Sequence, residues 1–381
     1  MTTLTRRRSP VRVCFVIDQL NRAGTESQLL ALIRTLDRRR VEPFLCLLDG
    51  ADPVSRELEP ERCPVLRLGL KGLARPRAVA AAARLRSFWR RNRIDIVQTY
   101  FLDSSYFSIP LARLCGVKTV IRVRNNAGYW LTRKHRLLGR LVGKLAHRTM
   151  TNSEAGRQSV VDAERVPPQK VVVLENGVDL ARFERHPPPN TNGAVVRVGV
   201  VANLRPVKNI DGLIRVAREL CRNHLRLEFE VAGEGEQRAE LEELIAACGL
   251  RERFRLLGSV ADVPAFLARQ DIAVLPSHSE GMSNALLEYM ASGRCIVATD
   301  VGGNGRLVTH EEQGLLVPPG DKAALGRAIE RVLSDPALSS QLGQNARRRA
   351  EEEFSRAAMC RRFKDFYLSL CARNGSSRSN N

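Results

Sequence analysis

The sequence predicts an α/β protein with two Rossmann-like domains, each built on a parallel sheet, that face a cleft. Short apolar runs alternate with longer helical patterns along most of the 381 residues. The strand candidates are almost continuously apolar, as in parallel sheets covered on both faces. The alternation runs twice, with the linker-like segment "RHPPPNTNG" at 185–193 between the two passes. A chain of this length accommodates two domains of ordinary size.

The first pass covers residues 1–187 and predicts the N-terminal domain. Helical patterns stand at 26–39 and 76–92, between the apolar runs. The strands expected in this domain are 11–18, 44–50, 94–100, 119–125, 148–153 and 170–179.

The second pass predicts a C-terminal domain over residues 194–355. Its expected strands are 196–204, 227–235, 254–260, 272–278, 295–301 and 314–320, and its helical patterns include 210–223, 237–249 and 322–335. A helix at 356–373 is expected to return to the N-terminal domain. The tail at 374–381 is too polar and too rich in Gly and Ser to fold alone.

The composition is that of a soluble globular protein, with 44% hydrophobic and 27% charged residues. No run of about eighteen apolar residues occurs, so no membrane-spanning helix is expected. Residues 1–18 have a basic start and a short apolar run with an aspartate, and we interpret them as a first core strand rather than a signal peptide. Nine scattered cysteines without a Cys-x-x-Cys pair indicate reduced thiols in a cytoplasm, and a zinc site is not expected.

The positive charge is concentrated in one half of the chain. Residues 1–190 hold 35 Lys and Arg against 17 Asp and Glu, a net charge of +18, whereas the remainder holds 26 against 24. A general preference for arginine would load both halves, so the imbalance indicates an anionic partner such as a membrane surface, a nucleic acid or an acidic polymer. Aromatic residues are only 5%, and no helix-turn-helix pattern is found, so no nucleic acid is expected.

Several expected strands of the second half end in loops rich in small or charged residues. Parallel strands gather such loops at one edge of a sheet, where unpaired backbone N–H groups favour phosphate. Arg205 and Lys208 in "LRPVKN" could clamp a diphosphate, although a solvated basic loop explains them as well. Gly233 belongs to an incomplete glycine fingerprint. Gly303 would allow close approach of a ligand, or would simply form a turn.

The stretch "PSHSEGMSNALLEYM" at 276–290 combines two carboxylates with the start of a helix. Glu288 stands four residues after the helix start at Asn284, on the same face, where its carboxylate could accept bonds from ribose hydroxyls. Glu280 precedes the turn and would project into the cleft. Alternatively, Glu288 only offsets the helix dipole and Glu280 is a solvated acid. The helix start would also present unpaired backbone N–H groups, which belong to Met282, Ser283 and Asn284.

The first half offers one comparable loop, "DQLNRAGTESQLLAL" at 18–32. Gly24 would allow close backbone approach, and Thr25 or Glu26 would open the following helix. The segment could bind an anion or a sugar hydroxyl, but an ordinary strand-to-helix turn has the same residues. Together, the loops of the two halves indicate a nucleotide-diphosphate pocket. No Asp-x-Asp stands at a strand end, so no bound metal is required.

Over nearly the whole chain these motifs resemble glycosyltransferase family 4, the retaining two-domain (GT-B) sugar transferases. "GTESQLL" is similar to the N-terminal glycine loop of the family, "ENGVD" to the segment before the linker, and "LRPVKN" to its Arg-x-x-Lys-Asn element. "SEGMSNALLEYMASGRCIVATDVGG" is similar to its Glu-x7-Glu signature, which is long and specific. The resemblance implies a metal-independent hexosyltransferase without a cofactor and with a UDP- or GDP-sugar as donor.

The resemblance also implies roles for individual residues. Arg205 and Lys208 would stabilise the leaving diphosphate, and Glu280 would face the donor sugar near the reacting carbon. Retention without an evident nucleophile favours front-face attack over covalent catalysis by Glu280. The donor-binding residues that the resemblance implies are Gly24, Gly233, Gly281, Met282, Ser283, Asn284, Glu288 and Gly303.

Two positions depart from the pattern of the family and put sugar contacts in doubt. Tyr100 stands where members often carry a histidine, and Arg306 stands where a glutamate commonly follows the Gly-Gly motif. The first half has "YFLDSSY" and "RVRNNAGYW" instead, which resemble a subgroup associated with polysaccharide assembly. A buried aromatic pair explains the second stretch equally well. The acceptor candidates are Thr25, Asp103, Arg122, Arg124, Asn126, Tyr129 and Trp130.

The sequence therefore predicts a cytoplasmic transferase that moves a sugar to a lipid-linked or polysaccharide acceptor in cell-envelope or exopolysaccharide synthesis. The basic N-terminal half, the expected acceptor-binding domain, would hold it at the inner face of the plasma membrane. Two alternatives stay open: a nucleotide-sugar epimerase on the same scaffold, and a basic nucleic-acid-binding protein.

Overall fold

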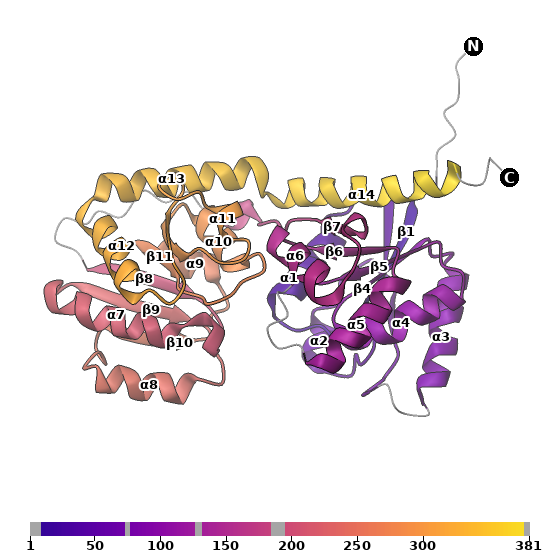
Figure 1. Ribbon diagram of the computed structural model, residues 1–381, viewed down its shortest axis with the longest axis horizontal. Coiled ribbons are helices and arrows are strands. Elements are labelled where there is room, and N and C mark those ends of the chain that lie inside the picture. The colour runs from indigo at the N-terminus through magenta and orange to yellow at the C-terminus, as the bar shows by residue number, and fades with distance from the viewer. Residues whose placement is uncertain (1–8, 73–76, 126–131, 184–194, 377–381) are drawn as a thin grey trace, which may run out of the picture. The chain divides into compact units, whose positions relative to one another are not determined.

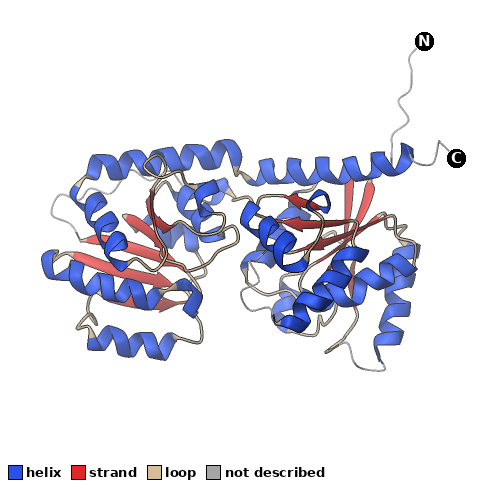
Figure 2. Cartoon of the chain, in the orientation of Figure 1, coloured by secondary structure: helices blue, strands red, loops and turns tan. Residues whose placement is uncertain are grey.

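The computed structural model describes residues 9–72, 77–125, 132–183 and 195–376. The chain forms two compact units (Figure 1). Unit 1 comprises Met1–Glu175 and Arg356–Asn381, and unit 2 comprises Asn176–Ser355. Each unit is a parallel sheet covered by helices, so the predicted α/β class with two Rossmann-like sheets is confirmed (Figure 2).

Unit 1 contains a seven-stranded sheet in the order β3-β2-β1-β4-β5-β6-β7. All neighbouring strands are parallel. The sequence order reverses between β1 and β4, which is where sheets of this type bind their ligands. The strands are β1 (Val11–Ile17), β2 (Val41–Leu47), β3 (Val65–Arg67), β4 (Ile96–Thr99), β5 (Thr119–Val123), β6 (Arg148–Thr151) and β7 (Val171–Val173).

The helices of unit 1 come from both ends of the chain. Helix α14 packs on α1 and β1, and Figure 1 shows it next to β1, so the prediction that the C-terminal helix returns to the first domain is confirmed. Its buried Met359, Phe363 and Tyr367 belong to the same apolar cluster as Phe15. The helices are α1 (Gly24–Thr35), α2 (Pro53–Glu57), α3 (Arg77–Arg91), α4 (Leu102–Leu114), α5 (Arg133–Leu145), α6 (Glu154–Glu164), the 3-10 turn η1 (Pro168–Lys170) and α14 (Arg356–Ser376).

Unit 2 contains a six-stranded parallel sheet in the order β10-β9-β8-β11-β12-β13. Numbered within the unit, this is the order 3-2-1-4-5-6 of the dinucleotide-binding fold. The strands are β8 (Val196–Val201), β9 (Leu227–Ala232), β10 (Phe254–Gly258), β11 (Ile272–Leu275), β12 (Cys295–Thr299) and β13 (Leu315–Val317).

The helices of unit 2 follow from amphipathic patterns. In α7 the residues Ile210, Leu213, Ile214 and Ala217 are fully buried, with the spacing of three and four that places them on one face. That face covers the sheet, whose strand β11 is buried throughout. The helices are α7 (Ile210–Asn223), α8 (Arg238–Ala247), α9 (Val263–Ala268), α10 (Asn284–Ser292), α11 (Asn304–Leu307), α12 (Lys322–Ser334) and α13 (Pro336–Glu353), with the 3-10 turns η2 (Leu180–Arg182) and η3 (Pro206–Lys208).

The chain enters unit 2 between Glu175 and Asn176, earlier than the predicted linker at 185–193. The Val178 N–H donates to the Phe354 carbonyl at 2.8 Å, and Val178 forms a bridge with Ser355. These contacts fix the segment in unit 2 and also end β7 after three residues. The linker segment itself, at 184–194, lies outside the described residues.

All nine cysteines lie in the described part of the chain, and each is a free thiol. Six are buried, and burial raises the pKa of Cys63 to about 12, so this sulfur stays protonated at neutral pH.

Candidate active site

The candidate site of unit 2 lies where the strand order reverses, between β8 and β11. The loops that follow these strands are joined by one backbone hydrogen bond and by the side chain of Asn209. The His278 N–H donates to the Val207 carbonyl at 2.8 Å, and the Asn209 amide donates to the Pro276 carbonyl at 3.0 Å. Asn209 has φ 54°, in the left-handed region that asparagine tolerates, and its side chain is buried. The two loops therefore form one edge, at the place where such sheets bind ligands.

Lys208 and Glu280 meet at this edge, one from each loop. Lys208 Nζ lies 2.6 Å from Glu280 Oε1, and the Ser277 hydroxyl donates to the same oxygen at 2.7 Å. The side chains are 21% and 10% exposed, so the pair is shielded from water but reachable. Arg205 begins the 3-10 turn η3 with an exposed side chain. The structure thus joins two of the three predicted catalytic residues and places the third on the same loop.

Two glycines allow the loops after β9 and β12 to pack against the loops after β8 and β11. Gly302 has φ +59°, and a Cβ there would stand 1.9 Å from the Glu280 carbonyl oxygen. The N–H of the adjacent Gly303 donates to the Gly281 carbonyl at 2.6 Å. Gly233 has φ +157°, and its Cβ would stand 1.9 Å from the Ala202 carbonyl oxygen. The close approach that these glycines permit is between loops, which brings the carboxyl ends of four strands together.

Helix α10 begins as the sequence predicts, with Ser283 as its N-cap and Gly293 as its left-handed C-cap. The Ser283 hydroxyl accepts from the Leu286 N–H at 3.3 Å, which leaves this side chain buried. The Asn284 side chain accepts a bond from the Asn176 amide at 2.9 Å, and the Asn176 N–H contacts the Met282 sulfur at 3.2 Å. Sequence reasoning missed Asn176 because no local pattern links "ENGVD" to a loop more than a hundred residues later.

Glu288 lies one helical turn after Asn284, in a partly buried position. Burial raises the pKa of its carboxyl group to about 7, against the opposing effect of Arg182. The group therefore changes charge near neutral pH. Arg182, in the 3-10 turn η2, was also missed, since nothing in its sequence surroundings indicates a carboxylate partner.

The corresponding edge of unit 1 carries several acids. Helix α1 starts at Gly24 with no side-chain cap, and Thr25 follows in its first turn. Asp18 accepts bonds from the N–H (2.8 Å) and the hydroxyl of Ser104. Burial raises the pKa of both Asp18 and Glu26 above their ordinary values. Asp103 lies exposed in the first turn of α4. Gly24, Thr25 and Asp103 therefore follow the carboxyl ends of β1 and β4, where the strand order of this sheet reverses, and their contact with a ligand stays a prediction.

The structure contradicts the prediction that Arg122 contacts an acceptor. The Arg122 side chain is 1% exposed, and its guanidinium group binds the Glu164 carboxylate and the Gly139 carbonyl. Arg124 lies 2.8 Å from the other Glu164 oxygen and is 6% exposed. Although burial acts to raise the pKa of Glu164, the two arginines hold it below its ordinary value. Both arginines therefore stabilise the interior of unit 1.

Asn126, Tyr129 and Trp130 lie outside the described residues. The two departures from the family pattern have structural explanations. Tyr100 is 4% exposed and accepts a bond from the Gln98 amide at 2.7 Å, so it is a core residue rather than a sugar contact. Arg306 pairs with Glu353 at 2.7 Å and lies over the ring of Phe354.

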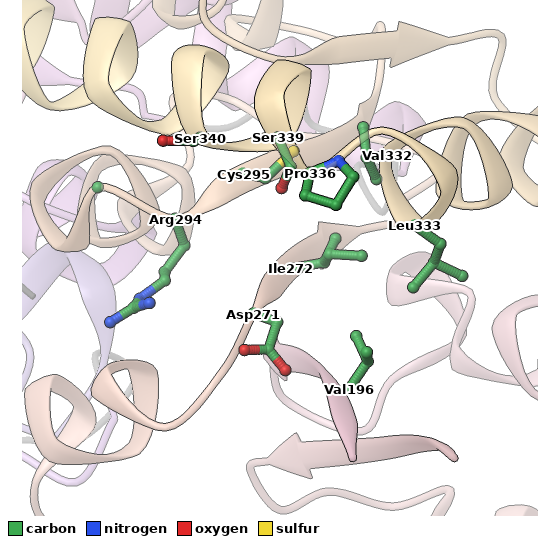
Figure 3. A pocket seen from close by; sticks show the side chains of 11 residues that line it. Val196, Asp271, Ile272, Arg294, Cys295, Val332, Leu333, Pro336, Ser339 and Ser340 are labelled. Atoms are coloured by element: carbon green, nitrogen blue, oxygen red, sulfur yellow. The ribbon is translucent and has the colours of Figure 1, made fainter. Parts of the chain in front are cut away.

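A small cavity lies at the opposite edge of the unit 2 sheet (Figure 3). It is lined by the first residues of β8, β11 and β12, namely Val196, Ile272 and Cys295. The space of about 30 Å³ has room for a water molecule but not for a nucleotide. The candidate active site is therefore the edge with Lys208 and Glu280, and not this cavity.

None of the described helices has the length and apolar character that crossing a membrane would need.

Known proteins share this chain's sequence in part and its fold almost throughout. The chain is 34% identical over 196 residues to the lipopolysaccharide core biosynthesis mannosyltransferase LpcC of Rhizobium leguminosarum bv. viciae, with 48% of this chain and 55% of that relative covered. It thus spans little more than half the length of that relative. It is 26% identical to the UDP-Gal:alpha-D-GlcNAc-diphosphoundecaprenol alpha-1,3-galactosyltransferase of Escherichia coli, over 74% of this chain and 77% of the relative.

The fold is similar to the crystal structure of HepE of Anabaena in complex with UDP. The TM-score is 0.81, with 20% identity over 94% of this chain and 100% of that one, a likeness that concerns the fold alone. A model of Glycosyltransferase Family 4 matches residues 22–182, and a model of Glycosyl transferases group 1 matches residues 182–349. The two models together cover most of the sequence, and the chain belongs to this family of glycosyltransferases.

Proposed function

We propose that the chain is a retaining hexosyltransferase that moves a sugar from a nucleotide diphosphate to a lipid-linked or polysaccharide acceptor. The observation that carries the proposal is the Lys208–Glu280 pair, held 2.6 Å apart where the unit 2 strand order reverses. This edge offers a cation, a carboxylate and a helix start within one group of loops. A nucleotide-diphosphate sugar needs all three of these features.

Unit 2 is the proposed nucleotide-sugar-binding domain. Arg205 and Lys208 would stabilise the charge that develops on the departing diphosphate, together with backbone N–H groups at the start of α10. These groups would do the work of a divalent cation, so the reaction is proposed to need no metal and no cofactor. Gly233 and Gly303 shape the loops around the diphosphate, through the close contacts of the β9 and β12 ends.

Glu280 is proposed to face the reacting carbon of the donor sugar. Its carboxylate is fixed by the Ser277 hydroxyl and by Lys208, so it would be oriented before the donor arrives. In the front-face mechanism the acceptor hydroxyl attacks on the side of the leaving group and gives its proton to the departing phosphate. The negative Glu280 would then stabilise the positive charge on the sugar ring.

Glu288 is proposed to accept hydrogen bonds from the ribose hydroxyls. It shares a helix face with Asn284, whose side chain is held by Asn176. With the carboxylate on the ribose, the diphosphate would lie towards the helix start and the sugar towards Glu280. Gly281, Met282 and the following residues would line that path.

Unit 1 is the proposed acceptor-binding domain, with Gly24, Thr25 and Asp103 at its ligand edge. The relatives named above act in lipopolysaccharide core synthesis and on a diphosphoundecaprenol acceptor, according to their names, which supports a lipid-linked acceptor in envelope or exopolysaccharide synthesis. The net charge of +18 in residues 1–190 supports association with an anionic membrane, at the cytoplasmic face.

A donor screen followed by a transfer assay tests this function. Saturation-transfer NMR against a panel of UDP- and GDP-sugars identifies the donor, and the expected result is binding of one nucleotide class, lost in Lys208→Ala. Incubation with the donor alone separates a transferase from an epimerase, since epimerisation needs no acceptor. Conversion of the donor to its epimer without an acceptor, or equal binding of all sugars by wild type and Lys208→Ala, would refute the proposal.

A further inference from the structure

Helix α5 exposes a row of leucines. Leu137 is 59% exposed, Leu141 is 53% and Leu145 is 40%, each four residues after the last. This spacing places them on neighbouring turns of one helix face. A soluble protein often exposes single leucines, but a row on one helix is an apolar surface that fits a partner.

The same helix carries only positive charge. Residues 132–148 contain six Lys and Arg and no Asp or Glu. Arg133, Lys134, Arg136 and Lys144 are exposed beside the leucines. Leucines with flanking basic residues on an otherwise well-anchored helix are typical of helices that lie in the headgroup region of a bilayer.

The opposite face of α5 packs closely against its neighbours at two glycines. A Cβ at Gly139 would stand 2.8 Å from the Glu164 carboxylate, and one at Gly143 would stand 2.9 Å from Val166. The Gly139 carbonyl accepts from the buried Arg122 at 3.0 Å. The glycines bring the helix close to α6, and the Arg122–Glu164–Arg124 group holds it there. The leucine face is thus presented on a fixed support.

We propose that α5 is the surface by which unit 1 docks on an anionic bilayer. Leu137, Leu141 and Leu145 would enter the boundary between headgroups and acyl chains, while the lysines and arginines extend to the lipid phosphates. The inference rests on the proposed function, because a lipid-linked acceptor is held at such a surface. It adds to that function the helix that contacts the membrane.

Charge selects the bilayer over a second copy of this chain. Two copies of α5 facing one another would bring the five cations of each helix together without an acidic residue, which disfavours self-association. Phospholipid headgroups supply negative charge at high density, and each basic residue near such a surface adds to the attraction. An acidic protein is the remaining candidate partner for this surface, and the following experiment distinguishes it from a bilayer.

Co-sedimentation of the full chain with vesicles tests the proposal. The probes are phosphatidylcholine vesicles with and without phosphatidylglycerol, and the variants are Leu137→Asp with Leu141→Asp, and Lys134→Glu with Lys144→Glu. Wild type is expected to bind only the anionic vesicles, and each double variant is expected to bind at least about tenfold less. Leu225→Asp is the matched control, because Leu225 is a leucine of unit 2 that is 77% exposed. This variant should bind the vesicles like wild type.

Nucleotide binding, measured by NMR, distinguishes a failure of the membrane-docking proposal from a failure of the proposed function. All variants should bind the nucleotide like wild type, which also shows that they are folded. Vesicle binding without sugar transfer would refute the function and leave the surface intact. Vesicle binding that survives both double variants, equal loss in Leu225→Asp, or no binding of wild type to any vesicle would overturn the assignment. The last result would leave an acidic protein as the partner.

Discussion

The fold favours the neutral form of the Glu288 carboxyl group, whereas its proposed role in binding needs the charged form. The unfolded chain releases this proton near the ordinary pKa of about 4.3, whereas burial raises the pKa in the folded protein to about 7. Between these values the folded state binds more protons, so stability falls as pH rises through the window. The charged form that the fold disfavours is the one proposed to hold the ribose.

A Glu288→Gln variant is therefore expected to match wild-type stability at pH 4, below the unfolded pKa, and to exceed it at pH 8. The gain, after allowance for partial exposure, is on the order of 2 kcal/mol. Urea unfolding at both pH values measures it. The nucleotide dissociation constant of wild type should fall by up to about tenfold between pH 6 and 8, and that of the variant should stay flat. Equal stability curves for the two proteins would contradict the burial argument.

Glu280 differs from Glu288 in having a cation and a hydroxyl as direct partners. Glu280→Gln keeps the shape and loses the charge, so we expect kcat to fall at least about 100-fold while nucleotide affinity changes less than about threefold. Steady-state kinetics and calorimetry measure the two effects. Glu243→Gln, on the exposed face of α8, is the control. A loss of affinity as large as the loss of kcat would assign Glu280 to binding alone.

At the scale of elements, the active edge depends on loops that touch through glycine. Gly302→Ala would place a methyl group 1.9 Å from the Glu280 carbonyl, whereas Gly249 has nearly the same backbone, φ +71°, with no atom within 4 Å. We expect Gly249→Ala to cost about 1 kcal/mol for the left-handed backbone alone, and Gly302→Ala to cost about 2 kcal/mol more and to reduce kcat. Chemical unfolding measures both. Equal costs would mean that the loops have room to separate.

Elements with a strong local pattern were predictable, and contacts between distant loops were not. Helix α7 has the predicted bounds 210–223, because its apolar spacing and its length are both properties of the segment itself. The Ser283 cap and the Gly293 end of α10 are likewise local. Strand β3 has three residues that are partly buried or exposed, so no apolar run marks it.

The site was predictable only where a motif already carried the chemistry. Lys208 and Glu280 could be named, but their contact could not, because it depends on the neighbouring positions of β8 and β11 in the sheet. Arg122 was assigned to an acceptor because it stands in "RVRNNAGYW", a stretch that resembles a subgroup of the family. Its partner Glu164 lies in α6, outside any stretch that the motif reading covered.

At the scale of the whole molecule, two units with separate cores predict two unfolding events. Phe363→Ala removes a buried ring of α14 from the unit 1 core and is expected to cost about 3–5 kcal/mol there. The bound nucleotide should raise the transition of unit 2 more than that of unit 1, since all the proposed nucleotide contacts except Gly24 lie in unit 2. Differential scanning calorimetry measures both effects. A single transition that the variant and the nucleotide shift together would mean that the units unfold as one.

The return of α14 to unit 1 also constrains how the protein is made. A ribosome completes residues 176–355, all of unit 2, before it reaches the helix that unit 1 requires. Until then the strip that Met359, Phe363 and Tyr367 cover is open on the first sheet, beside Phe15. The unit that is synthesised first is therefore finished last, and its unfinished surface is where a chaperone would bind the growing chain.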